Sequence, residues 1–93
     1  MLEKSYKKMA EYFKALSHPT RIKIIELVAE KERCVCEMME ILNLDQSHIS
    51  RHLTILRSME IVEDRREGNR VFYNLKDRES LDLIQTVKKK FFD

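Results

Sequence analysis

Two cysteines separated by one residue, Cys34 and Cys36, carry the most reactive side chains of this sequence. They stand at the expected start of a helix, where the helix dipole lowers the pKa of a thiol and favours the thiolate that binds soft metal ions. Met39 adds a soft thioether on roughly the same helical face as Cys36. Residues two apart on a regular helix diverge by about 200°, so joint binding of one ion would need a distorted first turn. The pattern predicts a soft-ion site at Cys34 and Cys36, with Met39 as a candidate third ligand.

The same two cysteines allow two other interpretations. They can oxidise as a thiol redox switch, or they can pack as small buried hydrophobes. Charged residues on both sides, Lys31 to Arg33 and then Glu37, favour a position near the surface over packing. The sequence has two cysteines in all and starts without a signal-peptide pattern, which favours reduced thiols in a cytoplasm over a disulfide framework.

The stretch from Asp45 to Met59 has the pattern of an amphipathic helix whose polar face suits DNA. Asp45 is a good N-cap, and an apolar stripe beginning at Ile49 recurs every three or four residues. The other side carries short hydrogen-bonding groups and one arginine, which fit the donors and acceptors of the major groove. His52 lies only about 60° from the Ile49 direction and is expected to pack. The predicted DNA-facing residues are Gln46, Ser47, His48, Ser50, Arg51 and Thr54.

The segments on either side of this helix predict a winged helix-turn-helix. A shorter apolar stripe precedes it and leads to Asn43, which tolerates the left-handed conformation that the turn needs. The two helices would form a helix-turn-helix over residues 34–59. Two strand-like runs surround Gly68-Asn69, a hairpin signal, and predict a wing over residues 61–75. The wing arginines expected to contact phosphates or the minor groove are Arg65, Arg66 and Arg70.

Amphipathic helices are also expected at both ends of the chain, over residues 1–16 and 78–92, and a central core helix is expected from Pro19 to about Lys31. A chain of 93 residues buries a modest core, and two terminal apolar stripes exceed what that core can cover. Burial between two copies would solve this problem, so the sequence predicts a homodimer. The terminal stripes consist of Leu2, Tyr6, Met9, Phe13, Leu16, Leu81, Ile84, Val87 and Phe91.

Composition narrows the function further. Charged residues make up 37% and hydrophobic residues 43% of the chain, which is typical of a folded domain. No apolar run is long enough to span a membrane, and no phosphate loop or nucleophile motif predicts an enzyme. The net charge of +2 is too small to indicate nucleic-acid binding by itself. The predicted fold is a single domain over residues 1–93, mainly α with a small β-hairpin.

Four segments together resemble the ArsR/SmtB family of metal-responsive winged-helix repressors: ALSHPTRIKII, CVCEMMEIL, SHISRHLTILRSMEIV and REGNRVFYNL. The resemblance covers residues 15–75. It implies a homodimer built on the first and last helices, which binds operator DNA without a cofactor and releases it when metal binds. CVC followed by an acidic residue looks like the family's arsenic- or antimony-sensing site, and this role carries over to Cys34 and Cys36.

The sequence departs from the family pattern at several positions. Met39 stands where the three-cysteine arsenic sensors have their third cysteine, residues 1–33 contain no cysteine, and residues 77–93 contain no histidine. Glu60 occupies a position where these repressors often have glycine. The predicted inducer is trivalent arsenic or antimony, and other soft ions are less favoured candidates. The alternatives are a thiol redox-sensing repressor and a winged-helix module that binds DNA or protein without sensing.

Overall fold

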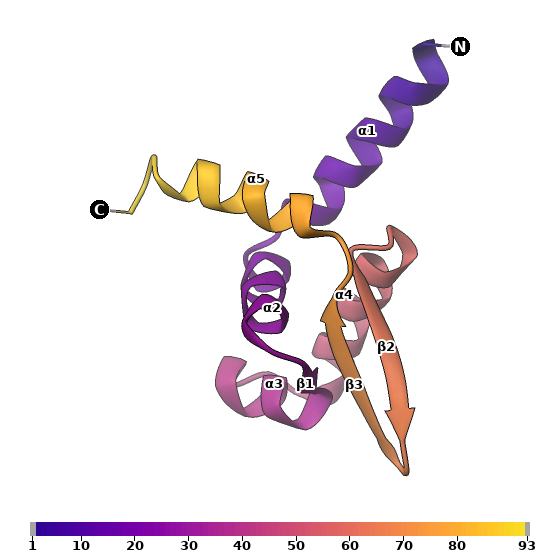
Figure 1. The fold of residues 1–93 in the computed structure, drawn as a ribbon, viewed down its shortest axis with the longest axis vertical. Coiled ribbons are helices and arrows are strands. Elements are labelled where there is room, and N and C mark those ends of the chain that lie inside the picture. The colour runs from indigo at the N-terminus through magenta and orange to yellow at the C-terminus, as the bar shows by residue number, and fades with distance from the viewer. Residues whose placement is uncertain (1, 93) are drawn as a thin grey trace.

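The computed structural model describes residues 2–92, and in this range the chain forms five helices and three short strands (Figure 1). The predicted fold class, a mainly helical winged helix-turn-helix with a β-hairpin, is confirmed. No helix within the described range is long and apolar enough to cross a membrane. The elements in order are α1 (Leu2–Leu16), α2 (Pro19–Glu30), β1 (Arg33–Cys34), α3 (Val35–Leu42), α4 (Gln46–Ser58), β2 (Val62–Glu67), β3 (Arg70–Leu75) and α5 (Arg78–Lys88).

Local sequence signals set the ends of α3 and α4. Asn43 adopts the left-handed conformation (φ 55°) at the C-terminus of α3, as expected for the helix-turn-helix turn. Asp45 caps α4, because its carboxylate accepts a hydrogen bond from the backbone N–H of His48 at 2.9 Å. Glu60, two residues after α4, is also left-handed (φ 57°). The chain therefore follows the expected turn geometry at both ends of α4.

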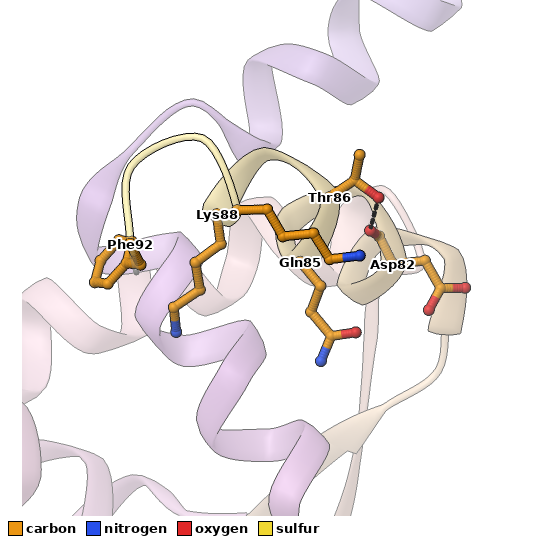
Figure 2. Close-up of a pocket in the computed structure, with 6 residues that line it drawn as sticks. Asp82, Gln85, Thr86, Lys88 and Phe92 are labelled. Atoms are coloured by element: carbon orange, nitrogen blue, oxygen red, sulfur yellow. Dashed lines mark hydrogen bonds between the residues drawn. The ribbon is translucent and has the colours of Figure 1, made fainter.

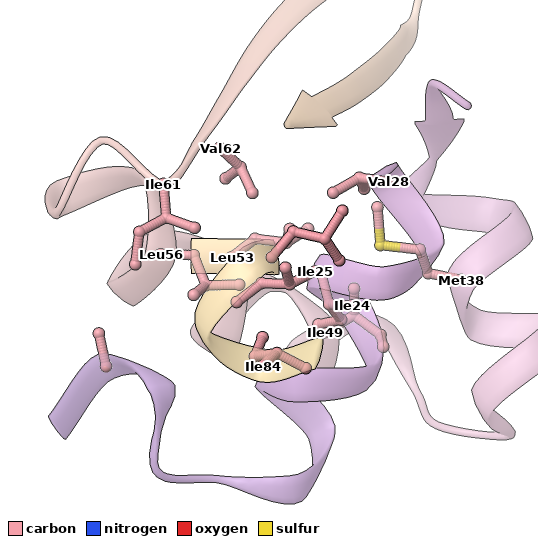
Figure 3. Close-up of a cluster of buried hydrophobic side chains, with 12 residues drawn as sticks. Ile24, Ile25, Val28, Met38, Ile49, Leu53, Leu56, Ile61, Val62 and Ile84 are labelled. Atoms are coloured by element: carbon pink, nitrogen blue, oxygen red, sulfur yellow. The ribbon is translucent and has the colours of Figure 1, made fainter. Parts of the chain in front are cut away.

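The hydrophobic core lies where α2, α3, α4, the start of β2 and α5 meet (Figure 3). Each of these elements contributes fully or almost fully buried side chains. The buried side of α4 therefore packs against the other elements of the core. Burial of each such aliphatic side chain contributes about 1.5–3 kcal/mol. The buried residues that Figure 3 labels are Ile24, Ile25, Val28, Met38, Ile49, Leu53, Leu56, Ile61, Val62 and Ile84.

The wing belongs to a three-stranded antiparallel sheet with strand order β1-β3-β2, one strand more than the predicted hairpin. β2 and β3 meet at Gly68-Asn69, where Gly68 has φ 64°. The additional strand β1 pairs with the outer side of β3, with Cys34 opposite Phe72. At two residues, β1 is too short to leave a period-two pattern in the sequence. The sheet therefore links the residue before α3 to the wing.

The two terminal helices differ from each other in how they pack. α1 projects from the rest of the fold (Figure 1), and its stripe residues Tyr6 and Phe13 are 62% and 53% exposed. α5 packs through Leu81 and Ile84, but ends at Lys88 instead of the predicted residue 92. The chain there tightens into a turn, because Phe91 donates its backbone N–H to the carbonyl of Lys88, three residues back, at 3.0 Å. Both termini leave apolar side chains on the surface.

Candidate DNA-binding surface and cysteine site

The outer face of α4 is polar and open to solvent, whereas its inner face is buried. Ser47 and the side chain of His48 both contact the Asp45 carboxylate, at 2.9 and 2.8 Å. Hydrogen bonds from the His48 backbone, the His48 ring and Ser47 lower the pKa of Asp45 to about 2. This network fixes the first turn of α4 while Arg51 extends into solvent one turn later. The predicted DNA-facing residues are all exposed: Gln46, Ser47, His48, Ser50, Arg51 and Thr54.

The three wing arginines fall into two groups. Arg66 and Arg70 are exposed on β2 and β3. Arg65 is exposed too, but it donates three hydrogen bonds to the Glu32 carboxylate, at 2.7, 2.9 and 3.0 Å, and its guanidinium lies 4.8 Å from the centre of the Phe72 ring. The same bonds lower the pKa of the Glu32 carboxyl and raise that of Arg65. Arg65 therefore ties β2 to the residue that precedes β1, a contact between residues 33 positions apart that local patterns do not indicate.

Cys34 and Cys36 are joined by a disulfide, and the prediction of two reduced thiols is wrong for this structure. The expected helical divergence of the two side chains is absent, because Cys34 lies in extended conformation before the helix and only Cys36 is helical. Their Cα atoms are 5.3 Å apart, within the range that a disulfide needs. Both sulfurs therefore meet without distortion of α3.

Cys34 is also the N-cap of α3. Its sulfur accepts a hydrogen bond from the backbone N–H of Glu37 at 3.2 Å, and the Glu37 carboxylate accepts one from the backbone N–H of Cys34 at 3.0 Å. This reciprocal pair is a capping box, with cysteine in the place usually taken by serine or threonine. Cys34 is 3% exposed, whereas Cys36 is exposed. A change at the Cys34 sulfur thus acts directly on the start of α3.

A cavity of about 220 Å³ brings together the three residues that the sequence suggested as ligands. Cys34, Cys36 and Met39 line one side of it, together with Val35. The other sides consist of Gln46, the first residue of α4, and wing residues 69–71. Within the described range, no cluster of three or more His, Cys, Asp or Glu side chains could hold a metal ion. The cavity lies between the two elements expected to contact DNA.

A buried polar cluster ties α1 and α2 to α4. Arg21 donates from Nε to the carbonyl of Ala15 at 2.6 Å, and its Nη1 lies 3.1 Å from Nδ1 of His52. The rings of His18 and His52 are 4.4 Å apart. Burial lowers the pKa of His52, and electrostatic repulsion from the neighbouring basic side chains, among them Arg21 and Arg51, adds to this effect. His52 packs as the sequence predicted, and as the neutral ring it accepts the Arg21 hydrogen bond.

Acidification is expected to destabilise the fold through His52. Its folded-state pKa is depressed, so the unfolded chain takes up the proton first as the pH falls below about 6.5. The stabilising contribution is fully present above that pH and is lost below it. Urea unfolding at pH 7.5 and pH 5.5 should show a smaller pH-dependent loss in His52→Gln than in wild type. Equal losses in His52→Gln and wild type would contradict this assignment.

Another cavity, of about 590 Å³, lies along α5 (Figure 2), and no cysteine lines it. All its lining residues come from α5 and the turn after it, so it is a groove on one side of a single helix. Lys88 from this groove pairs with Glu26 of α2 at 2.7 Å and lies 5.0 Å from the Phe92 ring. These contacts fasten the end of α5 to α2. The lining residues are Asp82, Gln85, Thr86, Lys88, Lys89 and Phe92.

An exposed polar helix in a helix-turn-helix, followed by a basic hairpin, is the architecture of a winged-helix DNA-binding regulator. Comparison with known proteins agrees with this class. A profile of the bacterial regulatory protein arsR family matches residues 18–64. The chain is 38% identical over 79 residues to a transcriptional repressor SmtB homologue of Synechocystis, and the match covers 85% of this chain and 60% of that protein.

Two further matches cover a larger share of the related protein than the match to the SmtB homologue does. The arsenical resistance operon repressor of Staphylococcus xylosus is 36% identical over 80 residues, which cover 86% of this chain and 76% of that one. The solution structure of a homodimeric winged helix-turn-helix DNA-binding domain from Mycobacterium bovis superposes with a TM-score of 0.85 at 28% identity, covering 98% of this chain and 87% of that one. The chain belongs to the arsR family of bacterial regulatory proteins. It is a DNA-binding transcription regulator and not an enzyme.

Proposed function

We propose that this protein is a metal(loid)-responsive repressor of the cytoplasm that binds operator DNA as a homodimer and releases it when a soft ion, As(III) or Sb(III), binds Cys34 and Cys36. The observation that carries the proposal is the cavity in which Cys34, Cys36 and Met39 face Gln46 and the wing tip. An arsenical resistance repressor is among the relatives, which supports this class of inducer. DNA binding itself requires no cofactor in this proposal.

The route from the cysteines to DNA runs through α4 and the wing. An ion held by the two sulfurs lies beside Gln46 and residues 69–71. The backbone of Cys34 pairs with Phe72 in the sheet, and Arg65 fastens the preceding Glu32 to the wing. Displacement of Cys34 therefore moves the wing and the start of α3 together. To change DNA occupancy from nearly full to nearly empty, the ion must favour the released state by about 5.5 kcal/mol, and two thiolate bonds are strong enough for this.

The DNA-contacting surface of the proposal combines α4 with the wing. Arg51 is expected to read bases in the major groove, whereas Arg66 and Arg70 contact phosphates or the minor groove. Arg65 has a role in DNA binding chiefly through the wing that it holds in place, since Glu32 already accepts its hydrogen bonds. The remaining contacts are assigned to Gln46, Ser47, His48, Ser50 and Thr54, which share the outer face of α4.

Arg51→Ala is expected to weaken DNA binding and relax sequence preference, whereas Arg66→Ala should lower affinity for all sequences alike. Loss of a bidentate base contact costs about 1–3 kcal/mol, and loss of a phosphate contact lowers the salt slope by about one. Binding isotherms at several salt concentrations, on a duplex selected from a random pool and on a scrambled duplex, measure both effects. Wild-type affinity and salt slope in both variants would show that another surface meets DNA.

The inducer assignment is tested with the reduced protein on the selected duplex. Arsenite is titrated in the presence of a phosphine reductant, which keeps the thiols free without offering a competing sulfur. Release of DNA should coincide with the thiolate-to-metalloid absorption band, because both report the same binding event. Absorption without release would leave a binding site with no regulatory role, and the absence of both would refute the proposal.

A second candidate function is a thiol redox sensor, and the Cys34–Cys36 disulfide supports it. In this case formation of the disulfide, without a metalloid, would release DNA. Oxidant added to metal-free protein separates the two functions. DNA release by oxidant that is reversed by phosphine, combined with indifference to arsenite, would select the redox sensor.

A further inference from the structure

The valence of trivalent arsenic does not match the protein ligands at the cysteine site. Arsenite forms three bonds to ligands, and the chain supplies two thiols, Cys34 and Cys36, as its only cysteines. The third soft group in the cavity is the Met39 thioether, which is uncharged and a weak partner. An arsenical with one organic substituent has two exchangeable oxygens, and two thiols replace both of them. The cysteine pair is therefore a complete ligand set for such a compound and an incomplete one for arsenite.

The space beside the cysteines also exceeds what a single ion needs. The cavity measures about 220 Å³, whereas one water molecule takes about 30 Å³ in the liquid. Val35, Met39 and Val71 contribute apolar side chains to its walls, and both valines are half-buried. An apolar substituent placed there would leave water and contact these side chains, which favours binding by about 25 cal/mol per Å² buried.

We propose that the cavity beside Cys34 and Cys36 takes a trivalent arsenical with one organic substituent, R–As(OH)₂, in preference to arsenite. This inference rests on the proposed function and narrows its inducer. Arsenic forms bonds to both sulfurs, both As–OH bonds break, and the two thiol protons leave with the hydroxides as two water molecules. No electrons are transferred, so the reaction starts from the reduced thiols. The arsenic bridges two sulfurs whose Cα atoms already lie 5.3 Å apart, and R occupies the space lined by Val35, Met39 and Val71.

The test compares phenylarsonous acid, methylarsonous acid and arsenite on the reduced full chain bound to its selected duplex, with phosphine as reductant. Any dithiol binds these compounds with different affinities. The concentration of each compound that releases DNA is therefore corrected for the affinity of a small dithiol for the same compound. After this correction, phenylarsonous acid should release DNA at a concentration lower than arsenite by about tenfold or more, as burial of one aromatic ring implies.

Two variants separate the cavity from the third ligand. Met39→Leu keeps the volume but removes the thioether, so it should weaken the response to arsenite and leave both organic arsenicals unchanged. Val71→Phe fills the cavity, so it should weaken the phenyl compound far more than the methyl compound or arsenite. Because Val71 lies in the wing, binding of each compound is also measured without DNA, by mass spectrometry of the intact protein.

Each outcome has a separate meaning. Corrected values that are equal, or that favour arsenite, would overturn the preference for organic arsenicals and leave the metalloid-responsive repressor standing. A phenyl preference that Val71→Phe does not reduce would also overturn the inference, because the cavity would then have no part in it. If none of the three compounds releases DNA from wild type, the proposed function itself fails.

Discussion

Cys34→Ser and Cys36→Ser proteins are expected to stay on DNA at arsenite concentrations that fully release the wild type. One remaining thiolate cannot chelate, and the roughly 5.5 kcal/mol needed for a nearly complete switch is then out of reach. DNA binding without inducer should be preserved in both variants. Serine is a preferred N-cap, so Oγ of the Cys34→Ser variant can accept the Glu37 N–H hydrogen bond that the sulfur accepts now. Cys36 is exposed, and its disulfide to Cys34 is already broken under the phosphine, so its replacement removes no buried side chain.

The measurement is fluorescence anisotropy of a labelled duplex during arsenite titration under phosphine. Met39→Leu is the matched control, since it changes the same cavity and leaves both thiols in place. It should still release DNA, at a higher arsenite concentration than the wild type. Release of DNA from the double serine variant would place the sensing site elsewhere. Loss of DNA binding in Cys34→Ser before any arsenite is added would show that the sulfur, and not only its hydrogen bond, supports the α3 start.

Most of the fold could be predicted because residues close together in the sequence mark where its helices and turns begin and end. Asn43, Asp45 and Gly68 mark a helix end, a helix start and a hairpin, and the structure has each feature at that position. The apolar stripe that starts at Ile49 also fixes which side of α4 is buried, so the exposed set could be predicted without coordinates. His52 is buried because it lies close to this apolar stripe around the helix axis.

What the sequence could not predict depends on contacts between distant residues. β1 exists because Arg33 and Cys34 pair with β3, about 40 residues later, and this pairing places Cys34 outside the helix. The prediction that joint binding must distort α3 assumed two helical cysteines, and that assumption is wrong. The Arg65–Glu32 ion pair could not be predicted either, because the residues near Arg65 do not distinguish it from Arg66. The cavity follows from both, because they hold the wing beside the cysteines.

The exposed stripe of α1 leads to the second large expected effect. As part of the proposed function, we expect Phe13→Glu to convert a dimer into a folded monomer that binds DNA poorly. Phe13 is 53% exposed in the single chain, next to Tyr6 and Met9, so a charge there costs little within one protomer. In a dimer built on this face the same charge would be buried without a partner, which is strongly unfavourable.

A matched control is Lys4→Gln, which lowers the net charge by one unit, as Phe13→Glu does. Lys4 lies on the opposite side of α1, because nine residues at about 100° each make two and a half turns. Sedimentation at micromolar concentration should give twice the chain mass for wild type and Lys4→Gln, and the single mass for Phe13→Glu. Affinity for the selected duplex should fall by about 10²–10⁴ in Phe13→Glu, because the second half-site is no longer bound at a high effective concentration. Circular dichroism should show that all three proteins keep their helices. A wild type that sediments as a monomer, or a Phe13→Glu protein that remains dimeric and binds DNA normally, would remove α1 from the interface and require another cover for its apolar face.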